Sequence, residues 1–354
     1  NESGGTMMET FKLHNYLSKK EFDDLKAEYA AFNASCKKSM IFHVGTGAGL
    51  YSELGSLLEC IMYCYVSKIR FVMYADDANF AGGHGWNAFF EDFGDESHNQ
   101  LNKEYNYRYA KYFRVGRLAL PNLLFRRLIM PTILKKQERV DYLTQDLFAE
   151  IISDKFHKQF IDWPIFNIHG SLSAEYSKLS SLCLRYTEET YQDIQKMIAD
   201  LNMPDDYVSI QIRGGDKTAE FTDIVGADYC IQKIEECVGQ VTNLFVFTDD
   251  YRNIEYIGEK RPDWNVFTLA REDERGYYND KFNKETWEIK RANLIKLFAM
   301  VELCIHSKHH IGCDGACVNL FIRSCRNGMA YDDYQIGNHR PNTIQNKIKR
   351  MVQI

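Results

Sequence analysis

Apolar and polar residues follow two different periods along the chain, and the period changes from one short segment to the next. Short apolar runs at 40–44 and 69–74 predict buried strands. Between them, a glycine-rich turn at 45–49 leads into 51–67, where apolar residues recur at helical spacing. Strand, helix and strand in this order form a βαβ unit, so the N-terminal half is predicted to be α/β with a parallel sheet.

The alternation returns more regularly in the C-terminal half. Its predicted elements are strands at 208–212, 243–248, 264–268 and 309–311 and helices at 187–201, 226–239, 251–261 and 285–304. Because Pro204 ends the preceding helix, we place a boundary between an N-terminal unit, 1–203, and a Rossmann-like unit, 204–354. The N-terminal unit would also contain a helix at 21–32 and a helical insertion at 114–186.

Size and charge limit the classes of protein that the chain can belong to. Its 354 residues exceed the size at which one hydrophobic core keeps growing, so two domains are expected. A formal net charge of -6 argues against a broad surface for nucleic acid. No apolar run reaches the roughly 18 residues needed to cross a bilayer, so no membrane span is expected.

The chain contains ten cysteines. Cys60, Cys64 and Cys304 lie within apolar helical patterns, so these thiols are expected to be reduced core residues. Reduced thiols favour the cytoplasm as the compartment. The sequence starts at Asn1 without a signal-peptide pattern, and the Golgi lumen would apply if an N-terminal anchor had been trimmed.

Candidate binding chemistry gathers at two loops of the C-terminal half. The strand at 208–212 runs directly into Arg213, two glycines, Asp216 and Lys217. Ligands of α/β sheets bind outside the carboxyl ends of strands, and cations there favour a phosphorylated ligand. The loop at 312–317 opens a further helix, whose free backbone amides could also hold a phosphate.

Other polar positions leave several interpretations open. One loop places His84 and Trp86 among three glycines, which suits either contact with a sugar face or anchoring of the loop. The adjacent acids at 76–77 could bind a metal or lie in solvent, and those at 249–250 could bind the metal of a metal-dependent transferase. The histidines and cysteines in 306–317 fit no common zinc spacing, so no metal site is assigned.

The polar motif after the strand at 208–212 resembles that of a known superfamily. Arg213, Asp216 and Lys217 resemble the Arg-rich motif of the fucosyltransferase superfamily that holds the α1,6-fucosyltransferases, the bacterial nodulation fucosyltransferase and the protein O-fucosyltransferases. The likeness is closest to the α1,6 type. Glu220 and Tyr229 are nine residues apart, the separation of the family's catalytic Glu and a following Tyr.

The resemblance extends over roughly residues 40–330. Segment 248–250 resembles the family's Thr-Asp-Asp, in which an acid contacts guanine. Segment 82–86 resembles its Gly-Gly-Trp loop, and 312–325 falls where its phosphate loop lies. The order and spacing of these segments carry the resemblance.

This resemblance implies a GT-B fold, in which two Rossmann-like α/β domains face a cleft and the second domain binds the donor. It implies an inverting, metal-independent glycosyltransferase that moves L-fucose from GDP-fucose to a glycan hydroxyl without a cofactor. The expected partners are a nucleotide sugar and an oligosaccharide or glycoprotein acceptor. The identity of the acceptor and the oligomeric state are not indicated.

The resemblance also implies roles for individual residues. Catalysis would use Glu220 as the general base, Arg213 as the phosphate-binding cation, and Lys217 and Asp216 as positioning or relay groups. Contacts with the donor are assigned to Gln211, Arg213, Tyr229, Asp250, Gly315, Ala316 and Cys317. His84 and Trp86 are assigned to the acceptor side.

Three of the places at which the sequence departs from the family bear on the donor and the phosphate loop. Gln211 stands where the family has His, Gly214 replaces a second Arg, and 313–317 lacks the hydroxyl groups of the phosphate loop. The lost cation leaves open another donor of the same enzyme class, such as GDP-mannose or an activated rhamnose. The altered phosphate loop leaves open a non-catalytic module that binds nucleotide sugars or glycans.

Overall fold

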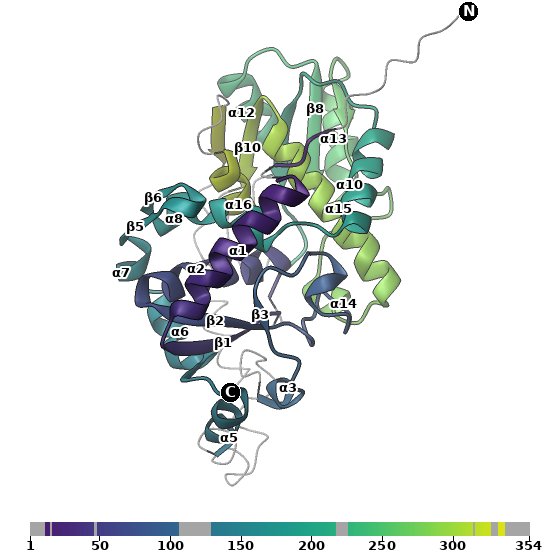
Figure 1. Cartoon of the computed structure of the whole chain (residues 1–354). Helices are drawn as coiled ribbons and strands as arrows, with labels where there is room; N and C mark the ends of the chain where they lie inside the picture. Colours follow the sequence, from purple (N-terminus) through teal and green to yellow (C-terminus); the bar gives the residue numbers. More distant parts are fainter. Residues whose placement is uncertain are drawn as a thin grey trace, which may run out of the picture.

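Two parallel sheets, one in each half of the chain, form the framework of the protein (Figure 1). The computed structural model describes residues 11–14, 16–45, 48–105, 129–216, 226–313, 316–326 and 332–336. The first sheet has the strand order β3-β2-β1-β4, and the second has the order β11-β10-β7-β8-β9. All strand pairs described in these two sheets are parallel, which confirms the predicted α/β class.

The helices and strands follow one another in the alternating order that parallel pairing requires. Those of the first half are α1 (Lys19–Ser35), β1 (Lys38–His43), α2 (Leu50–Ser67), β2 (Ile69–Tyr74), η1 (Trp86–Ala88), β3 (Asp95–Glu96), α3 (Leu101–Tyr105), α5 (Met130–Glu138), β4 (Tyr142–Leu143), α6 (Thr144–Ile151), α7 (Asp154–His157), β5 (Phe160–Trp163), η4 (Pro164–Phe166), β6 (Ile168–Ser171), α8 (Leu172–Glu175), η5 (Tyr176–Leu179) and α9 (Ser180–Cys183). Those of the second half are α10 (Glu188–Asp200), β7 (Val208–Ile212), α12 (Ala227–Cys237), β8 (Asn243–Thr248), α13 (Arg252–Lys260), β9 (Asn265–Phe267), α14 (Asn279–Phe282), α15 (Trp287–His306), β10 (His309–Cys313), α16 (Cys317–Arg326) and β11 (Asp332–Ile336).

Three strands, β2, β7 and β8, have the bounds that the apolar runs predict. The helical prediction for 114–186 is confirmed in part, because α5 to α9 lie in the portion that the structure describes. It misses three short strands: β4 joins β1, and β5 pairs with β6 in an antiparallel hairpin. In β5, Ile161 and Trp163 are buried whereas Phe160 and Asp162 are exposed. This period of two lasts for only four residues, too few to stand out against the neighbouring helical pattern.

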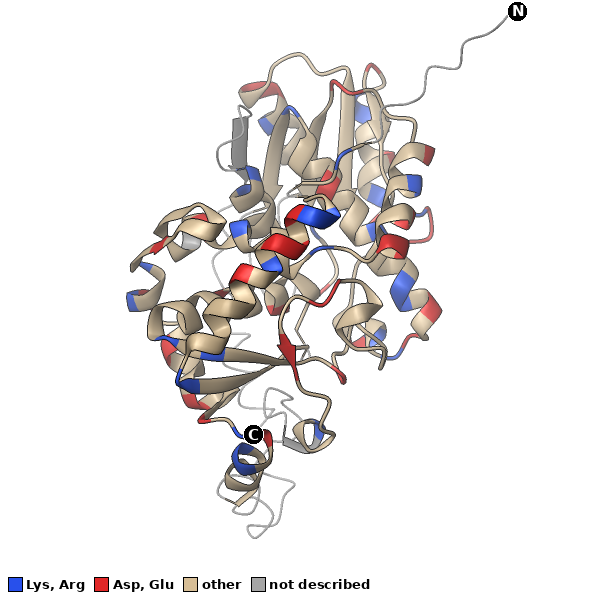
Figure 2. Cartoon of the chain, in the orientation of Figure 1, with Lys and Arg blue, Asp and Glu red and all other residues tan. Residues whose placement is uncertain are grey.

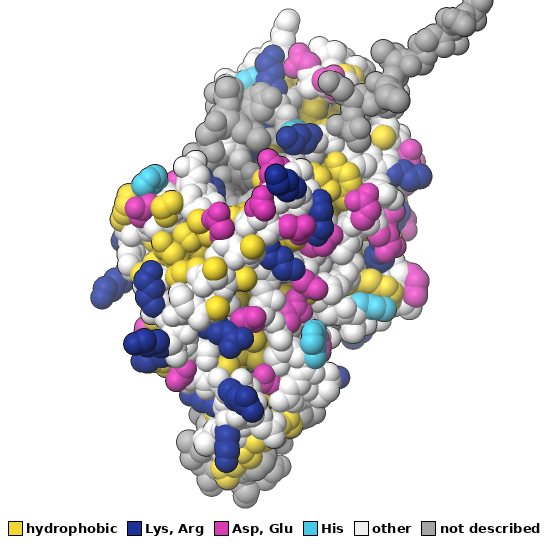
Figure 3. All heavy atoms as spheres, viewed as in Figure 1, with side chains coloured by type: hydrophobic (Ala, Val, Ile, Leu, Met, Phe, Trp, Pro, Cys, Tyr) yellow, Lys and Arg dark blue, Asp and Glu magenta, His cyan; other side chains and the backbone are white. Residues whose placement is uncertain are grey.

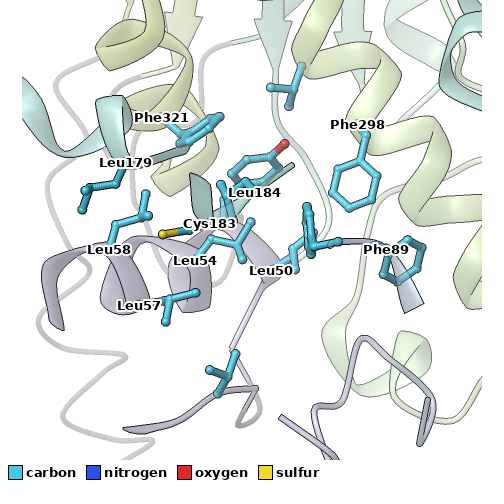
Figure 4. Packing of buried hydrophobic residues seen from close by; sticks show 14 of the residues in the cluster. Leu50, Leu54, Leu57, Leu58, Phe89, Leu179, Cys183, Leu184, Phe298 and Phe321 are labelled. Carbon is cyan, nitrogen blue, oxygen red and sulfur yellow. The ribbon is translucent and has the colours of Figure 1, made fainter. Parts of the chain in front are cut away.

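One apolar cluster connects the two sheets. It contains Phe42 of β1 and Phe247 of β8, together with side chains of α2, α15 and α16. Phe298 of α15 packs against Phe89 of the first half, with ring centroids 5.4 Å apart. Figure 4 shows Leu54 of α2 in the same packed group. Because each such buried side chain contributes about 1.5–3 kcal/mol, this cluster fixes the two halves against each other; the boundary near residue 203 remains a prediction.

Helix α1 lies across the face shown in Figure 1 and begins at a capping box. The Ser18 hydroxyl accepts a hydrogen bond from the Glu21 amide at 3.3 Å, and the Glu21 carboxylate accepts one from the Ser18 amide at 2.8 Å. The outer side of α1 carries charges of both signs (Figure 2), and acids and bases are mixed over this face (Figure 3). Among the described helices, none combines the length and apolar content that crossing a membrane requires.

The segment before α1 is attached to α15 by a buried ion pair. His14 Nδ1 lies 2.6 Å from Glu302 Oε1, and the His14 backbone amide donates to Glu302 Oε2 at 2.9 Å. Burial acts to lower the pKa of His14, but Glu302 and Cys325 together outweigh it and hold this pKa well above its ordinary value. The imidazolium therefore forms a charged link between the N-terminal segment and the core helix.

This link makes part of the stability depend on pH. Because the pKa of His14 is raised on folding, its stabilisation is complete below about pH 6.5 and is lost as the pH rises through the raised value. His14→Ala should lower the free energy of unfolding by about 3 kcal/mol at pH 6 and by less at alkaline pH, measured by urea denaturation. Lys12→Ala, which removes an exposed cation nearby, is the control. A pH-independent effect of His14→Ala would contradict the prediction.

Candidate functional site

A cavity of about 570 Å³ opens where the carboxyl ends of β7 and β8 face the first half of the chain. From the first half, residues 48–52 and 79–80 line it. From the second half, the lining comes from the ends of β7 and β8, parts of 271–282, α15 and the start of α16. Ligands of α/β proteins bind outside the carboxyl ends of parallel strands, so this cavity is the candidate site.

Arg213 follows β7 directly and its side chain, 16% exposed, lines the cavity. Its guanidinium nitrogens lie 3.9 Å from a carboxylate oxygen of Asp216 and 3.9 Å from one of Asp249. These distances are ion-pair distances but too long for hydrogen bonds. Arg213 Nε is buried and has no hydrogen-bond partner among the described residues. The guanidinium is therefore held in place by charge while donor capacity remains for a ligand.

Asp249 organises the loops around Arg213. Its two carboxylate oxygens accept hydrogen bonds from the backbone amides of Gly214 at 2.8 Å and Tyr277 at 3.0 Å. Its carbonyl oxygen accepts from the Gly276 amide at 2.6 Å, and the Asp216 amide donates to the Tyr277 carbonyl at 2.9 Å. One acid thus joins the loop after β7 to the loop before α14.

The two loops cross at a contact that only glycine allows. Gly215 has a φ of 58°, and a Cβ on it would overlap the backbone carbonyl of Tyr277. Gly276 has a φ of 99°, and its Cβ would stand 2.7 Å from the Cα of Gly215. Any side chain at either position would separate the loops, because the obstacle is backbone rather than a movable side chain.

Tyr277 supports the Arg213 side chain from within the cavity wall. Its ring centroid lies 6.0 Å from the guanidinium carbon. Burial, with the Asp216 carboxylate, raises the pKa of Tyr277 to about 12 against the opposing effect of Arg213. The phenol is therefore protonated at neutral pH and donates to Asn279 Oδ1 at 3.1 Å.

The start of α16 forms another part of the wall, through Ala316 and Cys317. A buried polar network fixes this helix: Asn319 donates to the Cys313 carbonyl at 3.1 Å, and its own carbonyl lies 3.1 Å from His310 Nε2. Burial lowers the pKa of His310 to about 3, so the ring is neutral. The first-turn amides of α16 are therefore held at the cavity by uncharged groups.

The structure brings four of the predicted site residues to this one cavity: Arg213, Asp216, Ala316 and Cys317. Gln211 precedes them on β7 and is 0% exposed, and neither polar atom of its amide has a partner among the described residues. Lys217, Glu220 and Gly315 lie outside the described residues, so their predicted roles remain predictions.

Two predicted donor contacts lie elsewhere. The Asp250 carboxylate accepts two hydrogen bonds from Arg252 Nε, at 2.9 and 3.1 Å. The Arg252 guanidinium holds the pKa of Asp250 below its ordinary value. Tyr229 lies on an exposed part of α12 beside the Lys233 ammonium, which is 5.4 Å from the ring centroid. Neither residue lines the cavity.

Of the two residues predicted for the acceptor side, Trp86 is buried in the core and His84 lies on the surface. Trp86 is 1% exposed and stacks on Phe90 with centroids 4.7 Å apart, so its ring offers no face to a sugar. His84 is exposed and packs on Trp287 at the start of α15. The glycines beside it line a second cavity of about 460 Å³, which shares Asn79 with the first.

Sequence reasoning missed the contribution of the loop before α14. Tyr277 and the crossing at Gly276 place Arg213, yet this segment carries no strong periodic pattern. The only local signal is a glycine followed by two tyrosines in a charged loop. Within the described part of the chain, no group of three or more histidines, cysteines or acids is arranged to hold a metal ion.

The crossing predicts a specific sensitivity to one methyl group. Gly215→Ala should destabilise the protein by about 1–3 kcal/mol, since the loops must separate. Urea denaturation measures this effect. Gly226→Ala is the matched control, because a Cβ there would meet nothing within 4 Å. Equal effects of the two substitutions would rule out the proposed importance of the crossing.

No protein-family model and no curated protein matches this sequence. Among solved structures, the chain is similar to the fucosyltransferase NodZ from Bradyrhizobium, with 12% identity, 82% of this chain and 93% of that chain covered, and a TM-score of 0.48. The chain is also similar to a variant of Arabidopsis thaliana FUT1 in complex with GDP, with 10% identity, 90% of this chain and 79% of that chain covered, and a TM-score of 0.46. POFUT1 in complex with GDP is similar at 9% identity, with 85% of this chain and 99% of that chain covered and a TM-score of 0.44. These values are too low to assign a function, which has to be argued from the residues of the cavity.

Proposed function

We propose that this protein is an inverting, metal-independent glycosyltransferase that moves L-fucose from GDP-fucose to a hydroxyl group of a glycan. The observation that carries the proposal is the partly buried Arg213, held by charge at the end of β7 with an unused Nε donor. Its position in a cavity lined from both halves of the chain suits a donor bound on one side and an acceptor on the other.

The chemistry requires stabilisation of a departing diphosphate. As the bond between the fucose anomeric carbon and the β-phosphate oxygen breaks, negative charge grows on the phosphate and positive charge on the sugar. A fixed guanidinium presents paired donors to such an anion, and Arg213 would supply this charge without a metal. The amides at Ala316 and Cys317 would add hydrogen bonds at the start of α16.

An inverting transfer also requires a base. The acceptor oxygen forms the new bond to the anomeric carbon, its proton passes to a carboxylate, and GDP leaves with the bonding electrons. We assign the carboxylate to Glu220, with Lys217 and Asp216 as positioning groups. We assign the acceptor to the second cavity, which shares the lining residue Asn79 with the first.

A different nucleotide sugar is the second candidate. Gly214 replaces a cation of the family motif, and its backbone amide already donates to Asp249, so this position offers a phosphate neither charge nor a free amide. Gln211 stands where the family has His, and its fully buried side chain does not line the cavity, so the contact with the base would differ. The donor would then be GDP-mannose or an activated rhamnose instead of GDP-fucose. If the protein has no turnover at all, it would be a non-catalytic module that binds nucleotide sugars or glycans.

The nucleotide of the donor is identified by calorimetric titration with GDP, UDP, ADP and TDP in the absence of magnesium. We expect GDP to bind most tightly. A preference for UDP or TDP would replace the first candidate by the second. Absence of turnover on broad acceptor arrays, with nucleotide binding intact, would favour the binding module.

Arg213→Ala tests the phosphate contact. It should lower kcat by about 10²- to 10³-fold, the usual effect of removing one preorganised donor to developing charge. Transfer from GDP-fucose to a glycan array, followed by mass spectrometry, measures the rate. Arg275→Ala is the control, since Arg275 is exposed and does not line the cavity. An unchanged rate in Arg213→Ala would exclude this role.

Glu220→Gln tests the base. It should lower kcat by about 10²- to 10⁴-fold while leaving the Kd for GDP unchanged, because the base acts on the acceptor and not on the nucleotide. Single-turnover transfer rates and GDP titration separate the two quantities. Glu259→Gln, on an exposed part of α13, is the control. Wild-type transfer by Glu220→Gln would remove Glu220 from the mechanism.

A further inference from the structure

A second charged cluster lines the same cavity, separate from Arg213 and its carboxylates. It consists of Arg271 and Glu274 in the loop after β9, with Asn293 and Lys296 on α15. Lys296 Nζ donates to Glu274 Oε1, and an Arg271 nitrogen lies 3.1 Å from the same oxygen. Arg271 also donates to Asn293 Oδ1 at 3.3 Å. Long side chains from a loop and a helix are thus fixed around one carboxylate.

The two oxygens of this carboxylate differ. Both cations make their shortest contact with Oε1, and the side-chain hydrogen bond that Glu274 accepts within the described part of the chain also ends on Oε1 and not on Oε2. The Glu274 side chain is only 15% exposed, so a ligand in the cavity would meet an acceptor in a poorly solvated place. Cations flank it. This pattern complements a ligand edge that carries N–H donors beside an oxygen acceptor.

An aromatic ring stands in the same loop. Tyr278 is 41% exposed, lines the cavity and lies four residues after Glu274. Its neighbour Tyr277 packs on Arg213, so the loop reaches from the phosphate-binding cation to the carboxylate. Four residues span at most about 14 Å. A nucleotide can therefore place its diphosphate at Arg213 and its base at Glu274, with Tyr278 available for stacking.

We propose that Glu274 is the residue that selects guanine, by accepting hydrogen bonds from the N1–H and the exocyclic N2 amine through Oε2. Arg271 and Lys296 would face the guanine O6. This inference rests on the proposed function and gives the base-reading role to Glu274 instead of Asp250. Asp250 does not line the cavity, and both its carboxylate oxygens are engaged by Arg252.

The carboxylate also predicts which bases are rejected. Adenine presents an unprotonated N1 where guanine presents N1–H, so it would place a lone pair against Glu274. Hypoxanthine keeps the N1–H and the O6 but lacks the N2 amine. Comparison of GDP with inosine diphosphate therefore isolates a single hydrogen bond to a charged acceptor, and comparison with ADP tests the whole edge.

The experiment is calorimetric titration of GDP, inosine diphosphate and ADP into the wild-type protein and two variants. The wild type should bind GDP at least about tenfold more tightly than inosine diphosphate. Glu274→Gln should reduce this ratio by about tenfold. Glu272→Gln, an exposed position on the same loop outside the cavity, should leave the ratio unchanged. If Glu274→Gln unfolds because Lys296 loses its partner, the double variant Glu274→Gln, Lys296→Met removes both charges and is measured instead.

The outcomes separate the inference from the function on which it rests. A ratio that falls only when Glu274 is replaced supports the inference. A wild type that prefers GDP, with a ratio unaffected by the Glu274 substitution, overturns the inference and leaves the proposed function intact. A wild type that does not prefer GDP over ADP or UDP overturns the proposed use of GDP-fucose, and the assignment of guanine with it.

Discussion

The structure depends on one apolar cluster that both sheets share, with α15 passing through it. Phe298 of α15 reaches Phe89 of the first half, and Leu294, Leu297 and Met300 of the same helix line the cavity. A helix that packs on both sides in this way cannot shift toward one sheet without opening a void beside the other, and such voids are costly in a close-packed interior. The distance between the carboxyl ends of the two sheets, and so the width of the site, is therefore set by hydrophobic packing.

Polar contacts then fix the positions of the loops around the cavity more precisely than apolar packing does. Asp249 accepts from the Gly214 and Tyr277 amides, and this one carboxylate aligns two loops that the sequence separates widely. In another part of the cavity wall, the neutral His310 and Asn319 fix the start of α16. Both arrangements place backbone and side-chain donors before any ligand arrives, so little conformational entropy is lost when one binds.

Sequence patterns predicted the parts of this structure that local periodicity controls. The strand β7 is buried throughout, and its apolar run and the polar residues after it can be recognised without tertiary information. The edge strand β3 could not be predicted, since it is made of Asp95 and Glu96, which are extended because they pair with β2. The crossing of Gly215 with Tyr277, and the pairing of Glu274 with Lys296, join loops and helices across long stretches of chain, for which no local pattern exists. The roles of Lys217 and Glu220 come from resemblance alone and remain predictions.

The two carboxylates beside Arg213 also bear on how a ligand would leave. An anion that enters the cavity would meet a guanidinium whose charge Asp216 and Asp249 already offset in part, at 3.9 Å in the structure, instead of a bare cation. The two carboxylates oppose part of the attraction between the guanidinium and the anion, so they lower the affinity for the anion. On departure, the same carboxylates restore the charge balance, and no unpaired cation is left in a poorly solvated place. This arrangement of charges therefore shortens the residence time of a bound anion more than it slows the binding of the anion.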